Sequence, residues 1–218
     1  GLNFSSLVLS MSMGVKLIAV LLIGVASLAL GMGLPVTASY IVLATLAGPA
    51  LLDLGVPLLV AHMIVFWYSQ AANVTPPVSL AAFAGAGVAG ARPMGTAVVA
   101  CKLAAGLYLI PLVMAYRPLL GMGKTYDLFH WEVGLAMLTT LLGLVAFAAA
   151  IERYFIRRAT WPETLLFLAA AGGLLWPEGW LDVVGIVLLA SAIGLQIRSK
   201  GGSAANKAAA GAVNNGNH

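Results

Sequence analysis

A polar segment, Asn73 to Ser79, interrupts a long apolar stretch of the chain and contains the adjacent prolines Pro76 and Pro77. The prolines remove two backbone donors and disfavour helical geometry at the preceding Thr75, so a helix that enters this segment has to end there. In hydrocarbon, the backbone groups freed by such a break cost several kcal/mol each unless protein, water or an ion satisfies them. We therefore interpret the segment as a binding site within a membrane helix.

The composition supports a membrane setting. Hydrophobic residues make up 61% of the chain and charged residues 8%, whereas a soluble domain carries about 25% charged residues. Apolar segments of about 20 residues recur, which indicates helices and not a barrel. The net charge of +4 does not indicate nucleic-acid binding, and the single cysteine, Cys101, excludes an internal disulfide.

A second break lies upstream, where Gly31, Gly33 and Pro35 separate an apolar helix over 15–30 from another over 36–52. Glycine and proline end helices and allow close backbone approach. Two short arms joined by such a tip predict a re-entrant hairpin over 15–52, although two ordinary short spans with a tight loop fit the same pattern.

Further helices are expected along the rest of the chain. We expect a short segment at 4–14, a broken helix over 57–86, and spans at 95–116, 132–151, 163–176 and 181–197. The fold class is thus an all-α integral membrane protein. The small, polar tail from Gly201 predicts disorder, and no signal peptide is visible at the start.

The basic residues divide unevenly between the two sides of this arrangement. Eight share one side and three the other, so the positive-inside rule places the larger group and the C-terminal tail in the cytoplasm. The larger group is Arg92, Lys102, Arg153, Arg157, Arg158, Arg198, Lys200 and Lys207, and the smaller is Lys16, Arg117 and Lys124.

Polar residues near the second break have two interpretations. Tyr68, Ser69 and Gln70 either line a substrate cavity or hydrogen-bond the freed carbonyls, and His62 is either a proton carrier or a hydrogen-bonded packing residue. The sequence contains no HExxH, no GxSxG and no paired acids in one span, so we do not expect an enzyme.

Together the two breaks suit a carrier. Helix C-termini and the hydroxyls of Thr37, Ser39 and Thr75 offer hard oxygen ligands for a cation, while helix N-termini favour an anion. If the breaks face each other, they provide what a cation-coupled carrier of an anionic solute needs.

The segment Gly31–Tyr40, followed by Asn73–Val78, resembles the large membrane subunit of tripartite ATP-independent periplasmic (TRAP) transporters, in particular the fused permeases of the TAXI branch. Trp161-Pro162-Glu163 and the run Leu174 to Trp180 resemble the additional helices of those permeases. In that family the large subunit has two inverted repeats, each with a hairpin and a broken helix carrying a Pro-Pro motif, and it works as an elevator.

The resemblance implies a domain organisation. Residues 1–119 resemble the second repeat (hairpin 15–52, broken helix 57–86, span 95–116), followed by transmembrane helices over 120–198 and a disordered cytoplasmic tail over 199–218. We expect the chain to be a fragment that lacks the first repeat and the small-subunit helices. The implied partners are those missing parts, a periplasmic TAXI-type binding protein and membrane lipid. Nucleic acid is not an expected partner.

The resemblance also implies a function in the bacterial inner (plasma) membrane: uptake of an organic acid driven by a sodium or proton gradient. The expected ion and substrate site comprises Gly31, Gly33, Pro35, Thr37, Ser39, Asn73, Thr75, Pro76 and Pro77. Thr37, Asn73 and Thr75 form the candidate sodium site, and no other metal or cofactor is expected. The alternative is a non-transporting membrane scaffold or assembly subunit in which the breaks are packing kinks.

Overall fold

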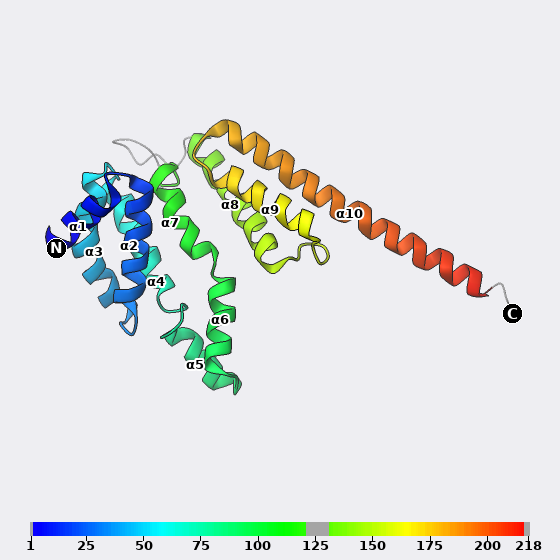
Figure 1. Cartoon of the computed structure of the whole chain (residues 1–218), viewed down its shortest axis with the longest axis horizontal. Helices are drawn as coiled ribbons and strands as arrows, with labels where there is room; N and C mark the ends of the chain where they lie inside the picture. Colours follow the sequence, from blue (N-terminus) through cyan, green and yellow to red (C-terminus); the bar gives the residue numbers. More distant parts are fainter. Residues whose placement is uncertain (1, 121–130, 216–218) are drawn as a thin grey trace. The chain divides into compact units, whose positions relative to one another are not determined.

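The computed structural model describes residues 2–120 and 131–215, and the described part of the chain is built from helices without a β-sheet (Figure 1). Four helical stretches within it are long and apolar enough to cross a membrane: Val36–Asp53, Pro93–Tyr116, Trp131–Glu152 and Gly179–Arg198. The predicted all-α integral membrane class is confirmed. The helices are α1 (Leu2–Ser12), α2 (Lys16–Gly31), α3 (Val36–Asp53), α4 (Leu58–Ala71), α5 (Leu80–Ala89), α6 (Pro93–Leu103), α7 (Gly106–Tyr116), α8 (Trp131–Glu152), α9 (Trp161–Leu175) and α10 (Gly179–Asn215).

The chain divides into two compact units, an N-terminal unit over Gly1–Met137 and a C-terminal unit over Leu138–His218. In the N-terminal unit, α3 packs on α1, α2 and α4, α4 also packs on α2 and α7, and α5 packs on α6. Fully buried side chains such as Ile23, Leu43 and Ile64 form its core. Gly24 allows the ring of Tyr68 to approach α2, since a Cβ at Gly24 would lie 2.8 Å from Tyr68 Cζ.

Helices end at both of the segments where the sequence predicts a break. The chain leaves helical structure between Gly31 and Val36, and again between Ala71 and Leu80. Proline occupies the position before α3 at Pro35 and before α4 at Pro57, with φ of −57° at each. Because proline lacks a backbone donor, the start of a helix is where it costs least.

The predicted span over 95–116 corresponds to the stretch Pro93–Tyr116, within which α6 ends at Leu103 and α7 begins at Gly106, so that Ala104 and Ala105 form a turn. Hydrogen bonds there connect residues three apart, from Ala105 N to Lys102 O at 3.2 Å and from Leu107 N to Ala104 O at 2.8 Å. Gly106 has low helix propensity and Pro111 cannot donate to the carbonyl of Leu107, so the helix is weakened on the C-terminal side of the interruption.

The C-terminal unit is organised around close packing of α9 on α10. A Cβ at Gly185 would lie 2.6 Å from Leu174 Cγ, and one at Gly173 would lie 3.1 Å from Leu181 O, so the two glycines bring the helices together. The buried cluster around this contact consists of Ala146, Ala149, Ala150, Phe167, Ala170, Ala171, Leu174, Leu189 and Ala192.

The structure differs from the expected disordered tail over 199–218, because α10 continues as a helix to Asn215. Alanine recurs between Ala204 and Ala212 and has the highest helix propensity of all residues. The remaining three residues of that tail, and Lys124 in the orientation argument, lie outside the described residues.

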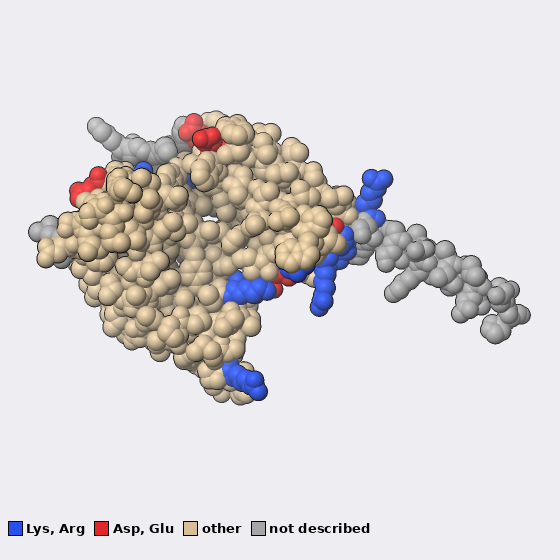
Figure 2. All heavy atoms as spheres, viewed as in Figure 1, with Lys and Arg blue, Asp and Glu red and all other residues tan. Residues whose placement is uncertain are grey.

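Large apolar side chains remain exposed along the helices of both units. Val25 and Val88 in the N-terminal unit and Leu141 and Leu165 in the C-terminal unit are each more than half exposed. On the face shown in Figure 2, uncharged side chains cover most of the described surface. Monomeric soluble proteins rarely expose continuous apolar surface of this kind, whereas hydrocarbon accommodates it.

Candidate functional site: two helix breaks that meet

Gly31, the last residue of α2, is where the two breaks meet. A Cβ at this position would lie 2.8 Å from Ala72 Cβ and 2.9 Å from Ser39 Oγ. The backbone at the end of α2 therefore touches both the first turns of α3 and the start of the second break. We call the two segments Gly31–Ser39 and Ala72–Ser79 together the break junction.

A second contact joins the same segments at Gly33. This residue has φ of +80°, a conformation that glycine adopts readily, and Val78 Cγ1 lies 3.9 Å from the position of a Cβ there. The side chain of Thr37 is exposed in the first turn of α3, whereas Ser39, two residues on, is 1% exposed.

Asn73 and Thr75 satisfy carbonyls at the end of α4. Asn73 Nδ2 donates to Ser69 O at 3.2 Å, and Thr75 Oγ1 donates to Ala71 O. These are carbonyls that the break removes from the helical ladder. Pro76 and Pro77 follow in the turn, joined by a cis peptide bond, with Pro77 exposed.

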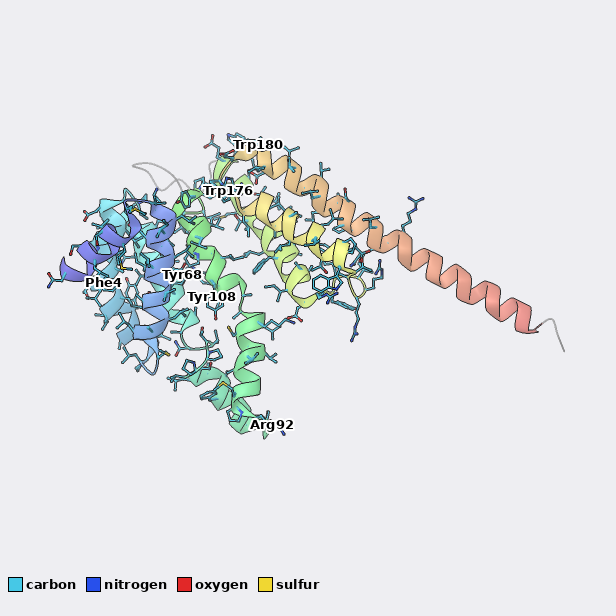
Figure 3. The ribbon with its side chains drawn as sticks, viewed as in Figure 1. Phe4, Tyr68, Arg92, Tyr108, Trp176 and Trp180 are labelled. Atoms are coloured by element: carbon cyan, nitrogen blue, oxygen red, sulfur yellow. The ribbon has the colours of Figure 1, made fainter. Side chains whose placement is uncertain are left out.

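Tyr108 of α7 extends this network, and the sequence analysis missed it. Its hydroxyl lies 2.7 Å from Thr75 Oγ1 and 3.2 Å from Cys101 Sγ. Figure 3 labels Tyr108 and Tyr68 within the N-terminal unit. A tyrosine hydroxyl in an otherwise apolar helix needs a polar partner, which is the one signal by which the sequence could have indicated Tyr108.

Three serine hydroxyls in and beside the break junction are buried without a hydrogen-bond partner among the described residues: Ser27, Ser39 and Ser79. Ser27 lies one helical turn before Gly31 on the same face of α2, which is the face that meets Ser39. An unsatisfied buried hydroxyl costs about 1–3 kcal/mol, so such groups require an explanation. Neutral oxygens of this kind are suitable ligands for a hard cation.

Residues 1–120 match the family model described as the DctM component of tripartite ATP-independent periplasmic transporters. The chain belongs to this family. The predicted resemblance to the large membrane subunit is thus confirmed, and the chain is a membrane component of a TRAP transporter and not an enzyme. Residues 134–187 match a domain of unknown function (DUF3394). No curated protein and no solved structure matches the chain.

The DctM-family match places the break junction within the transporter part of the chain, and the other polar residues there have local partners. Ser69 Oγ donates to Phe66 O at 2.7 Å, a carbonyl inside α4 and not one that the break frees. Tyr68 is buried against Gly24, which indicates packing. His62 Nδ1 lies 2.8 Å from Tyr40 OH, so His62 is a hydrogen-bonded residue between α3 and α4.

The DctM-family chain offers oxygen atoms for cation binding and no cluster of acidic, histidine or cysteine side chains among its described residues. The structure brings Gly31, Ser39 and the segment from Ala72 to Val78 together. It gives Thr37 an exposed position, and Asn73 and Thr75 have hydrogen bonds to α4.

Proposed function

We propose that this TRAP membrane component is the permease part of a secondary transporter in which a cation gradient drives uptake of organic acids. A TAXI-type periplasmic binding protein delivers the acid, and the transporter lies in the bacterial inner (plasma) membrane with the C-terminus of this chain in the cytoplasm. Membership of the DctM family supports the transporter role. The resemblance of Trp161-Pro162-Glu163 and of Leu174 to Trp180 to TAXI permeases supports the finer assignment.

The observation that carries the proposal is the approach of Gly31 to Ala72 and Ser39. It brings two interrupted helices to one point, where helix C-termini lie beside the unpartnered hydroxyls of Ser39 and Ser79. Broken helices that meet in this way are how secondary transporters hold ions and substrates at the membrane midplane.

The proposed sodium site is in the break junction. Its ligands are the backbone carbonyls of both breaks with Thr37, Asn73 and Thr75, and Ser39 supplies a further hydroxyl. Asn73 donates through Nδ2, which leaves its Oδ1 for a cation. Gly31, Gly33 and Pro35 shape the first break, and Pro76 and Pro77 hold the second one open, so that the substrate is bound beside the ion.

Other parts of the transporter complete the proposed assembly. The partners are the periplasmic binding protein, the other inverted repeat and the small-subunit helices. The basic residues Arg92, Lys102, Arg153, Arg157 and Arg158 face the cytoplasm, and the hairpin over 15–52 enters from the outer side, as the positive-inside rule predicts.

Thermal unfolding of the detergent-purified full chain in sodium or potassium at equal ionic strength tests the proposal. A bound ion stabilises by about 2.7 kcal/mol at a hundredfold excess over Kd. We expect a sodium-specific rise in Tm that Ser39→Ala abolishes. Removing an unpartnered hydroxyl should not lower the Tm in potassium. Ser191→Ala, which removes an exposed hydroxyl bonded to Val187 O, is the matched control and should keep the rise.

The scaffold alternative predicts a different result. If the breaks are packing kinks, sodium and potassium give the same Tm in the wild type, and Ser39→Ala and Thr75→Ala have no ion-dependent effect. Equal Tm values would therefore overturn the sodium site and point to proton coupling or to the scaffold.

A further inference from the structure

The turn between α8 and α9 carries three arginines, and one of them forms a salt bridge within the protein. Arg157 forms a salt bridge with Glu163, which is 6% exposed and also accepts a hydrogen bond from Thr160 N at 2.9 Å. Arg153 and Arg158 are exposed and have no salt bridge within the described residues. Two guanidinium groups therefore remain for an external anion.

The backbone of this turn is fixed by its own hydrogen bonds. Ala159 N donates to Arg153 O at 2.7 Å, and Tyr154 pairs with Arg158 in an isolated antiparallel bridge. Ile156 N donates to Oε1 of the fully buried Gln196 at 3.0 Å, which attaches the turn to α10. Because the turn is held in this way, the positions from which Arg153 and Arg158 project are preorganised for a ligand.

The two arginines outside the salt bridge line a pocket. Glu152, Arg153, Arg158 and Ala159 surround a cavity of about 330 Å³, at the lower end of the range for small-molecule sites. The Arg153 guanidinium lies 4.3 Å from the centroid of the Trp161 ring, and this cation–π contact orients it. The Glu152 side chain or backbone also takes part in an interaction within the protein.

The pocket lies where a membrane helix ends. α8 is long and apolar enough to cross a membrane, and its last residue is Glu152. Exposed aromatic side chains follow at Tyr154 and Trp161, which are 55% and 68% exposed. Aromatic rings and arginines at the end of a span are typical of the membrane interface, the depth of the lipid phosphates.

We propose that this pocket binds the phosphate headgroup of an anionic phospholipid. Arg153 and Arg158 bring two guanidinium groups to the lining, which favours an anionic headgroup such as that of phosphatidylglycerol. Guanidinium groups bind phosphate oxygens through paired hydrogen bonds. The bound lipid connects the end of α8 to the start of α9 and holds the C-terminal unit at the interface. This inference does not depend on the proposed transport function.

Lipid retention by the full chain tests this site. The chain is reconstituted into nanodiscs of phosphatidylglycerol and phosphatidylcholine in equal amounts, released into detergent, and the retained lipid is counted by native mass spectrometry. The wild type should retain phosphatidylglycerol over phosphatidylcholine, and Arg158→Gln should reduce that retention at least fivefold. Arg92→Gln removes the same charge from an exposed arginine at the α5–α6 turn, labelled in Figure 3, and should leave retention unchanged.

Two further measurements identify the ligand. Arg158→Lys keeps the charge without the paired donors, so we expect retention between those of the wild type and Arg158→Gln. Inorganic phosphate at millimolar concentration should not displace the lipid if the acyl chains contribute to binding. Displacement by phosphate, or equal retention in the wild type and Arg158→Gln, would overturn the proposal.

Discussion

The hydroxyl of Tyr108 lies 2.7 Å from Oγ1 of Thr75, so a side chain of α7 is hydrogen-bonded within the break between α4 and α5. Thr75 Oγ1 donates in turn to Ala71 O, and Cys101 Sγ lies 3.2 Å from the same tyrosine hydroxyl. Four polar groups from α4, the break, α6 and α7 thus form one chain. In a low-dielectric interior the members of such a chain polarise one another.

Tyr108→Phe and Thr75→Val should each lower the free energy of unfolding by about 1 kcal/mol, because each removes one partner of a part-buried hydrogen bond. The double variant should lose less than the sum, with a coupling energy of about 0.5–1.5 kcal/mol. Chemical unfolding in detergent measures all three. Tyr154→Phe, at an exposed ring in the C-terminal unit, is the control and should change little. If the loss in the double variant equalled the sum of the two single losses in free energy of unfolding, the two hydroxyls would not interact.

Gly31→Ala should destabilise the N-terminal unit by about 1–3 kcal/mol, because the added methyl group would lie 2.8 Å from Ala72 Cβ. Gly87→Ala is the matched control, since no heavy atom outside the neighbouring backbone lies within 4 Å of its Cβ position in α5. The control should stabilise by about 0.5–1 kcal/mol, because alanine has the higher helix propensity. Tm shifts of the same sign in both variants would contradict the close approach at Gly31.

Replacing Pro76 and Pro77 together with alanine should allow helix to form across residues 72–79. Each alanine restores a backbone donor, and the constraint on Thr75 disappears. Hydrogen exchange followed by mass spectrometry should show slower exchange in this segment, and the sodium-specific rise in Tm should be lost. Pro57→Ala, at the start of α4, is the control. A sodium effect that survives in the double variant would show that the open break is not required.

Glu163→Gln should lower the stability of the C-terminal unit by about 1.5–3 kcal/mol. Its buried carboxylate accepts from Arg157 and Thr160 and completes the capping box of α9, and hydrogen bonds to a charged group are the stronger ones. Glu132→Gln, at an exposed acid in the first turn of α8, is the matched control and should cost less than 1 kcal/mol. Equal losses in the two variants would contradict a stabilising role for the buried pair.

The breaks could be predicted from the sequence because their causes are local. Pro76 and Pro77 prevent a helix from continuing through the segment after α4, which ends at Ala71, and Gly31 to Pro35 end α2. The membrane class followed in the same way from apolar segments of sufficient length. The interruption at Ala104 and Ala105 was not predicted because the helix propensity of the surrounding residues is high and the weakening residues follow it.

The contacts of the site could not be predicted from spacing. The approach of Gly31 to Ala72 depends on how α2 packs on α4, and the pairing of Tyr108 with Thr75 depends on how α7 packs on α4. Both join residues more than 30 positions apart. Likewise, the sequence did not distinguish the exposed Thr37 from the buried Ser39, because which face of α3 is covered depends on the neighbouring helices.

The interruption between α6 and α7 has a mechanical consequence. α5 and α6 pack on each other, and the two places where this pair joins the rest of the N-terminal unit, Ala72–Ser79 and Ala104–Ala105, are both non-helical (Figure 1). The pair is therefore joined to the rest of the unit through turns, and the hydrogen bonds that hold one of these turns run from Ala105 N to Lys102 O and from Leu107 N to Ala104 O. α6 has 11 residues. At 1.5 Å per residue, a rotation of about 10° would carry its far end, near Arg92, through about 3 Å.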